Sequence, residues 1–270
     1  MPAIAKTKQL PETKKGFTLI EVMLVLGLTG LLIVGMLGGT FTAIAHQRYN
    51  DSVRSFAEYL RTVYGEVLSP ESLGAGNSMS EAVFGKILVF GYNYPDSSDS
   101  TRSVYSATLI GKADIPTSID GDFMDELAYV EAHLYCGDAG SSSTQDYYLP
   151  LWEASLAKAN NTHSSEPFVG TVLIARSPTS GTVHTYFSEN LTYDLRDGCT
   201  SENQTASGIF RTDIQDRRAE YRQEAVGFCI KSENAAVYRE VRLAEDGRNT
   251  SAISILDTDS DIPGEENRCR

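Results

Sequence analysis

The pattern of apolar and polar positions begins with a long uninterrupted apolar segment. Residues 22–45 form a run of 24 residues without a charged side chain. An α-helix needs roughly 20 apolar residues to cross the hydrocarbon core of a bilayer. The pattern therefore predicts one membrane-spanning helix near the N-terminus.

Beyond His46, apolar residues recur every three or four positions as far as Val67, which places them on one face of a helix. The apolar face carries Val53, Phe56, Ala57, Leu60, Val63, Tyr64 and Val67, and the opposite face carries Asp51, Arg54, Glu58, Arg61 and Glu66. Pro70 prevents the helix from continuing. We therefore expect one helix from about Thr18 to Ser69, roughly 78 Å long at 1.5 Å per residue.

From residue 71 the pattern changes to short runs rich in β-branched and aromatic residues, separated by turn residues. The expected strands are residues 83–92, 102–112, 127–135, 169–176, 181–187, 225–231, 237–243 and 251–256, with turns at 95–99, 177–180 and 245–248. Residues 149–159 are expected to form a short helix. The chain is thus predicted to be an α+β protein, with one long N-terminal helix packed on an antiparallel β-sheet head.

The apolar run is preceded by a polar leader that ends in Lys14, Lys15 and Gly16. One acid, Glu21, stands at the N-terminal edge of the run. A charged side chain costs roughly 2.5–3.5 kcal/mol at the centre of a bilayer and less near its surface. Glu21 is therefore expected to have a partner.

Residues 16–21 (GFTLIE), which follow a basic leader and precede an apolar helix, resemble the N-terminus of type IV prepilins. The resemblance covers about residues 14–69. It implies that a prepilin peptidase cleaves after Gly16, that Phe17 is then N-methylated and that the helix is retained. It also implies that Glu21 meets the N-terminal amine of a neighbouring pilin subunit.

Elementary chemistry agrees with these implications. A peptidase that draws a membrane-surface bond into its site favours a residue without a side chain, here Gly16. Cleavage creates a cationic amine at Phe17, but within one chain Glu21 points away from that terminus. A second copy, displaced along the helix axis, can supply the amine. Because an unpaired buried charge is costly, this pair enforces register more than it adds stability.

The head carries a second resemblance. Residues 83–86 (VFGK) and the closing segment 242–250 (RLAEDGRNT) are similar to the H-type minor pseudopilins and related minor pilins. The head is longer than usual for that group, with inserted loops around 137–167 and 190–224. The size and the unusual head favour a minor rather than a major subunit.

The expected divisions are a leader at 1–16, a membrane or filament-core helix at 17–45, its amphipathic continuation at 46–69 and an extracytoplasmic β-rich head at 70–270. The net charge is −13, and the leader contributes +3 (four Lys and one Glu), so the chain without its leader carries −13 − 3 = −16. Such an acidic head gives no strong nucleic-acid signal. The basic leader predicts a cytoplasmic N-terminus, a single pass through the inner membrane and a head outside, later on a surface filament.

Three other interpretations explain part of the pattern. A secretory signal peptide with an A-x-A site at 43–45 has an apolar core of roughly 7–15 residues, shorter than this run. A plain anchor, with or without an exported binding or adhesion module, explains the length and flanking charge but not the six-residue match. An anchored enzyme lacks a visible site, because no G-x-S-x-G, H-E-x-x-H, P-loop or dinucleotide motif is present.

The four cysteines, Cys136, Cys199, Cys229 and Cys269, include no C-x-x-C pair, which argues against a zinc ribbon or a thioredoxin-like site. Exported proteins commonly form disulfides. Three pairings are open, as is a set of four buried thiols. We favour Cys136 with Cys199 and Cys229 with Cys269, because the second pair would tie down the penultimate residue.

No cofactor is expected, with calcium as a secondary candidate. Asp257, Asp259 and Asp261 alternate as in calcium loops, but Gly264 and Arg268 do not fit the EF-hand positions. The alternative is a solvated acidic tail. The four histidines show no metal-ligand spacing. Four arginines, Arg211, Arg217, Arg218 and Arg222, alternate with acids, which favours a mixed exposed helix over a DNA-binding surface.

Overall fold

The computed structural model describes residues 16–69, 82–91, 104–113, 130–135, 146–159, 168–177, 180–189, 205–206, 221–231, 239–256 and 269. Two compact units divide the chain at residues 45 and 46. The first unit, residues 1–45, contains the start of the long helix. The second unit, residues 46–270, contains the rest of the helix and all the strands described below.

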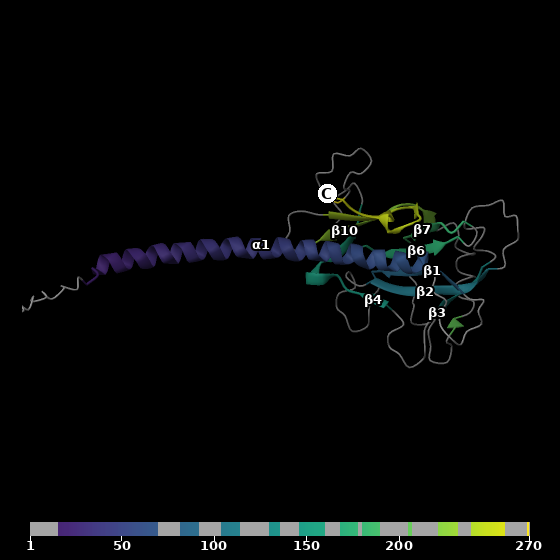
Figure 1. Ribbon diagram of the computed structural model, residues 1–270, viewed down its shortest axis with the longest axis horizontal. Helices are drawn as coiled ribbons and strands as arrows, with labels where there is room; N and C mark the ends of the chain where they lie inside the picture. The colour runs from purple at the N-terminus through teal and green to yellow at the C-terminus, as the bar shows by residue number, and fades with distance from the viewer. Residues whose placement is uncertain are drawn as a thin grey trace, which may run out of the picture. The chain divides into compact units, whose positions relative to one another are not determined.

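Helix α1 runs from Leu19 to Leu68, within one residue of the predicted bounds at each end (Figure 1). In the second unit, all seven residues of the predicted apolar face are buried, together with Tyr49 and Ser52. Helical spacing of apolar residues therefore identified the face that packs. The charged positions opposite are exposed or half-buried.

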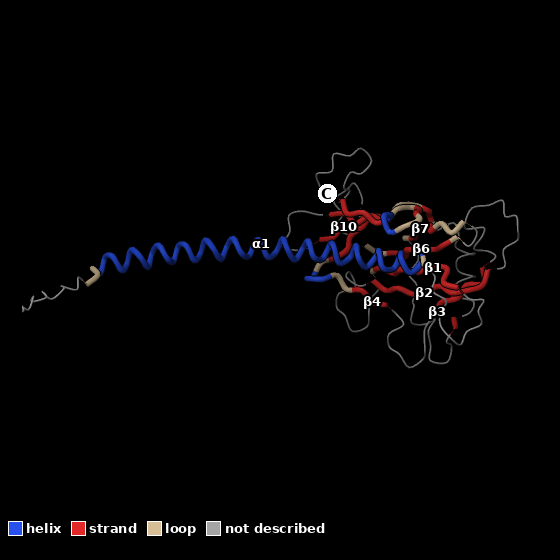
Figure 2. Tube along the Cα trace, in the orientation of Figure 1, coloured by secondary structure: helices blue, strands red, loops and turns tan. Residues whose placement is uncertain are grey.

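The described strands form two antiparallel sheets (Figure 2). The larger sheet has the order β12 (Asp246–Gly247), β7 (Val183–Ser188), β6 (Gly170–Arg176), β1 (Ala82–Phe90), β2 (Val104–Ala113), β3 (Val130–Tyr135) and β8 (Thr205–Ala206), with β4 (Asp146–Tyr148) on β2 and β9 (Arg222–Gln223) on β7. The smaller sheet has the order β13 (Ile253–Leu256), β11 (Arg239–Leu243), β10 (Val226–Lys231) and β5 (Ser155–Lys158). The predicted α+β architecture, a long helix on antiparallel β-structure, is confirmed, with two sheets in place of one.

One hydrophobic core joins the helix to both sheets. The buried helix residues lie in the same cluster as residues of β1 and β6 from the larger sheet and of β10 and β11 from the smaller one. Phe228 of β10 is at its centre, with ring centroids 5.3 Å from Phe56, 5.0 Å from Phe90 and 4.7 Å from Phe168. Since aromatic rings bury large areas, this cluster is a main source of stability in the second unit.

Polar contacts fix the helix along its length. The hydroxyl of Tyr49 accepts a hydrogen bond from the backbone N–H of Arg239 (2.6 Å) and donates one to the carbonyl of Ile230 (3.2 Å). At the other end, the buried ammonium of Lys86 pairs with the carboxylate of Glu66. These contacts hold the helix in one register against β1, β10 and β11.

The turn between β11 and β13 connects the two sheets. Its two-residue strand β12 leaves the smaller sheet and pairs with β7 of the larger one. Gly247 approaches the helix so closely that a Cβ there would lie 2.7 Å from the hydroxyl oxygen of Tyr64 and 3.0 Å from the Cβ of Ala252. A glycine is therefore required where the two sheets and the helix meet.

The predicted helix at residues 149–159 is wrong. Leu151–Glu153 form a single 3-10 turn, and β5 follows, paired with β10. The apolar residues there are spaced like a helix, but pairing with β10 places Leu156 in the core and leaves Trp152 exposed. The helix expected around the arginines is also wrong at Arg222, which lies in strand β9. Arg211, Arg217 and Arg218 lie outside the described residues.

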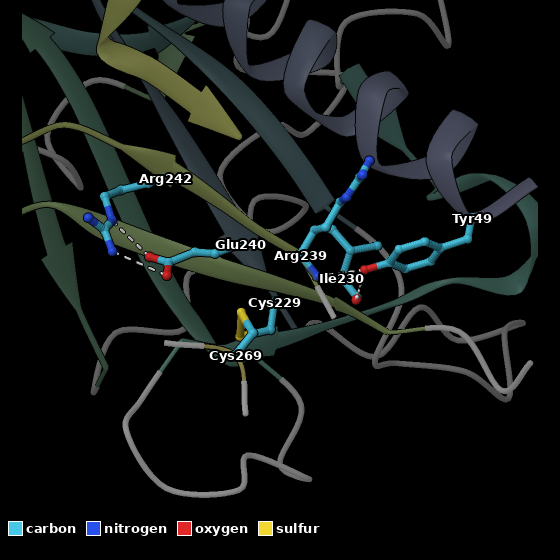
Figure 3. The surroundings of a disulfide bond; sticks show 7 residues. All are labelled: Tyr49, Cys229, Ile230, Arg239, Glu240, Arg242 and Cys269. Carbon is cyan, nitrogen blue, oxygen red and sulfur yellow. Dashed lines mark hydrogen bonds and ion pairs between the residues drawn. A yellow bond between two sulfur atoms is a disulfide. The ribbon is translucent and has the colours of Figure 1, made fainter. Parts of the chain in front are cut away.

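A disulfide joins Cys229 to Cys269, with the Cα atoms 5.4 Å apart (Figure 3). This is the pairing favoured from the sequence. Cys229 lies in β10 opposite Glu240 of β11, whose buried carboxylate accepts two hydrogen bonds from Arg242 (2.8 and 3.2 Å). The other favoured pair, Cys136 with Cys199, lies outside the described residues.

Candidate functional site

The predicted processing site lies immediately before the first turn of α1. Residues 16–18 are not helical, and Phe17 has 81% of its surface exposed. A bond between Gly16 and Phe17 therefore lies in an accessible, non-helical segment, which is the form of chain that a peptidase can take into its site.

Gly16 has no structural reason within the described chain to be a glycine. A Cβ built at this position meets no heavy atom within 4 Å, and the backbone does not have the positive φ that favours glycine. The reason for a glycine therefore lies outside the folded chain, as expected for a residue that an enzyme must recognise.

Thr18 forms the cap of the helix. Its side-chain oxygen accepts a hydrogen bond from the backbone N–H of Glu21 (3.3 Å), and its carbonyl accepts from Glu21 (3.1 Å) and Val22 (3.2 Å). Threonine is a favoured residue at this position because it satisfies one of the unpaired N–H groups of the first turn. The sequence analysis missed this role, although the spacing T-x-x-E at residues 18–21 is the signature of a capping box.

Glu21 lies in the first turn of α1, where the helix dipole favours a negative charge. Its side chain is exposed, and it has no ion-pair partner among the residues that the structure describes. The carboxylate is thus available to a group from outside the chain.

The surface of α1 that follows is apolar on all sides. From residue 19 to residue 44, every side chain of this helix is exposed, and α1 is long and apolar enough to cross a membrane. The hydroxyls within it are satisfied locally: Thr29, Thr40 and Thr42 donate to carbonyls of the preceding turn at 2.6–3.2 Å. A helix that is apolar all round must be covered by lipid or by other protein.

The glycines in this segment also lack an explanation within one chain. A Cβ at Gly27, Gly30, Gly35, Gly38 or Gly39 would meet nothing within 4 Å. Each glycine costs roughly 1 kcal/mol of helix stability relative to alanine in water. Gly35 and Gly39 have the G-x-x-x-G spacing that permits close approach of a second helix in a membrane.

Residues 13–37 match the family model of the prokaryotic N-terminal methylation motif. The chain carries a class III signal. This finding agrees with the resemblance to type IV prepilins and pseudopilins, and the motif is structural rather than enzymatic. It implies processing by a prepilin peptidase, assembly with other pilins and a single-pass anchor before assembly. No curated protein and no solved structure matches the chain.

The predicted calcium ligands, Asp257, Asp259 and Asp261, lie outside the described residues. Within the part of the chain that the structure describes, no group of three or more His, Cys, Asp or Glu side chains is arranged to hold a metal ion. Of the four histidines, His184 is half-buried, and its Nδ1 lies 3.2 Å from Nε2 of Gln223. The candidate site is therefore the N-terminal segment of α1.

Proposed function

We propose that the chain is a minor subunit of a type IV pilus or related pseudopilus. It is inserted in the inner membrane with its N-terminus in the cytoplasm and its head outside, cleaved after Gly16 and methylated at Phe17. The mature subunit then enters a filament through the first half of α1. The observation that supports this most strongly is a methylation motif leading into a helix whose apolar surface is exposed among the residues that the structure describes.

In this proposal, the apolar surface of the helix is covered both before and after assembly. Lipid surrounds residues 17–45 in the precursor, and the same segments of sister subunits replace the lipid in the filament. Cleavage exposes an amine at Phe17, which pairs with Glu21 of the neighbour. Because the pair forms only at one axial displacement, it sets the register of adjacent helices.

The processing step is tested by Gly16→Phe and Gly16→Ala expressed with the peptidase. We expect Gly16→Phe to retain the precursor mass, because the enlarged residue no longer fits the peptidase. Gly16→Ala, which adds one methyl group, should be cleaved more completely than Gly16→Phe. A mature mass for Gly16→Phe equal to that of the parent protein would show that cleavage does not depend on this residue.

The assembly step is tested by Glu21→Gln, which keeps the shape of the side chain and removes its charge. We expect anchoring and cleavage to persist while incorporation into sheared filaments falls at least tenfold, which corresponds to about 1.4 kcal/mol. Asp51→Asn is the matched control, because Asp51 is an exposed acid on the same helix. Normal incorporation of Glu21→Gln would favour a membrane-anchored head that does not assemble through this pair.

A further inference from the structure

The described part of the head has a compact exposed apolar patch. Leu149, Leu151 and Trp152 keep 48%, 46% and 51% of their surfaces exposed. Among the residues of the second unit whose side-chain exposure is described, the only other large apolar side chain with comparable exposure is Val169. Three of these four side chains thus lie within four consecutive positions, which we call the Trp152 patch.

The fold holds the Trp152 patch outward. Trp152 has φ 57° and ψ 40°, a left-handed conformation that bulky residues rarely adopt. Pro150 and Ala154, on either side of the turn, are buried. The chain is therefore anchored at both ends of a turn that directs Leu151 and Trp152 outward, and the exposed Leu149 precedes this turn.

The place of the Trp152 patch is fixed by Arg48. The guanidinium carbon of Arg48 lies 4.8 Å from the centroid of the Trp152 ring, a cation–π contact. Figure 2 shows the short turn containing Trp152 beside α1. Arg48 follows Ala45, the last residue of the uncharged run, by three positions, which is less than one helical turn of about 3.6 residues. The Trp152 patch is thus in contact with a residue of the second unit that follows closely, in the sequence, the end of the uncharged run.

We propose that the Trp152 patch inserts into the boundary between headgroups and acyl chains of the bilayer that α1 crosses, and so docks the head on the membrane before assembly. The proposal rests on the membrane insertion of α1 proposed above. Tryptophan is enriched at this depth of membranes because its ring is apolar and its N–H is polar. An arginine that closely follows the apolar run of a membrane span, as Arg48 does, likewise reaches toward the interface with its charged group.

The observations favour contact by apolar insertion over general electrostatic attraction. The chain without its leader carries a charge of −16, which opposes binding to anionic lipid. Leucine and tryptophan side chains insert into a neutral interface as well as into an anionic one. We therefore expect docking on zwitterionic phosphatidylcholine and little dependence on salt.

Trp152 is the only tryptophan of the chain, so emission excited at the red edge of tryptophan absorption, where tyrosine does not absorb, reports on this patch. The full-length chain is reconstituted in phosphatidylcholine vesicles that contain a quencher attached either near the headgroup or deep in the acyl chain. We expect the shallow quencher to reduce the emission severalfold more than the deep one. Aqueous iodide should quench the emission only weakly.

The matched control moves the tryptophan along the second unit. Arg248 is exposed and follows Gly247, which lies beside Tyr64 of α1. Tyr64 is sixteen residues beyond Arg48 on the same helix, which is about 24 Å along the helix axis. In a Trp152→Phe, Arg248→Trp double variant, we expect severalfold stronger quenching by iodide and none by either lipid quencher. Leu149→Asp with Leu151→Asp should make Trp152 accessible to iodide while the protein still floats with vesicles.

Flotation separates failure of this inference from failure of the proposed function. If the protein floats with vesicles but Trp152 is as accessible to iodide as the tryptophan of the control, docking is refuted and anchoring stands. If the protein does not float, the proposed membrane insertion fails first. Protection of Trp152 only in lipid-free filaments would show that a second copy of the chain, rather than lipid, covers the patch, which also refutes docking on the membrane.

Discussion

Two buried tyrosines of α1 differ in the hydrogen bonding of their hydroxyl groups. The hydroxyl of Tyr49 bridges the backbone of Arg239 and Ile230. The hydroxyl of Tyr64 is buried without a hydrogen-bond partner among the described residues. A buried hydroxyl without a hydrogen-bond partner lowers the stability of the fold. Removing a buried hydroxyl that has partners also lowers it, because the partners are left without a hydrogen bond.

The same substitution should therefore have different effects at these positions. We expect Tyr49→Phe to lower the free energy of unfolding by about 1–3 kcal/mol, because it leaves a buried N–H and a buried carbonyl without their partner. Tyr64→Phe should change it by less than about 0.5 kcal/mol or increase it. Urea unfolding of both variants measures the difference, and equal losses would contradict this account.

Tyr64 also predicts a dependence on pH. Burial, and then the charge of Asp246, raise the pKa of Tyr64 from 10.0 to about 12. The unfolded chain ionises this phenol near pH 10, so the stabilising contribution is complete below that pH and is lost as the pH rises toward 12. In Tyr64→Phe, the free energy of unfolding should fall less steeply between pH 10 and 12. An identical slope in the two proteins would count against the raised pKa.

At the residue scale, the sequence predicted what depends on neighbours along the chain. The spacing from Val53 to Val67 was sufficient to identify the buried face of the helix, because helical periodicity is local. The exposed Trp152 was not predicted, because an apolar side chain is ordinarily expected in a core. Its position depends on a left-handed backbone and on Arg48, which lies about a hundred residues earlier in the sequence.

At the scale of elements, glycines differ in whether a neighbouring element leaves space for a side chain. Gly85 of β1 lies against the adjacent strand β6, and a Cβ there would be 2.4 Å from the carbonyl oxygen of Ile174 and 3.0 Å from the Cα of Ala175. Gly65 of α1 lies beside open space, and a Cβ there would meet nothing within 4 Å. One glycine is required by strand packing, and the other is not.

Gly85→Ala should therefore lower the free energy of unfolding by about 3 kcal/mol or more, because backbone rather than a movable side chain obstructs the methyl group. Gly65→Ala should raise it by up to about 1 kcal/mol, since alanine favours a helix. Thermal unfolding of the two variants beside the parent protein provides the measurement. A stable Gly85→Ala would mean that β1 and β6 are not paired this closely.

The strands were predicted better than their arrangement. Runs such as Gly170–Arg176 and Val226–Lys231 are recognisable from β-branched and aromatic residues within a few positions. Their division into two sheets follows from pairing between distant segments, such as β5 with β10. A single sequence contains no direct signal for such pairing, which is also why residues 149–159 were predicted to form a helix.

At the scale of the whole molecule, the disulfide closes a long loop. Cys229 and Cys269 are 40 residues apart, and the bond fixes Cys269 against the middle of the smaller sheet. In the chain-entropy model, a loop of this length stabilises the folded state by about 4 kcal/mol. The bond is thus one of the larger single contributions to the stability of the head.

A Cys229→Ala, Cys269→Ala double variant should lose up to about 4 kcal/mol in the free energy of unfolding, and the use of two alanines avoids a free thiol. Dithiothreitol should lower the stability of the parent protein by more than it lowers that of the double variant. Equal stability of the parent and the double variant would show that this bond adds little to the fold.

The candidate site was predictable at this scale only in its local part. Residues 16–21 lie together in the sequence, so a short motif identifies the cleavage position and the acid. The partner expected for Glu21 belongs to another copy of the chain, so it cannot be identified from contacts within one chain. The cap formed by Thr18 is local as well, and the T-x-x-E spacing would have been sufficient to find it, although it was not predicted.

The hydrophobic core unites Tyr49 with Ile253, two residues separated by 253 − 49 = 204 positions. The apolar face of the helix is translated early, but β11 and β13, which supply part of its cover, are translated about 200 residues later. If the head is exported as proposed above, the chain must cross the membrane before this core can close, and folding is completed after translocation. Until then, the apolar face of the helix would be accessible to a chaperone on the far side of the membrane.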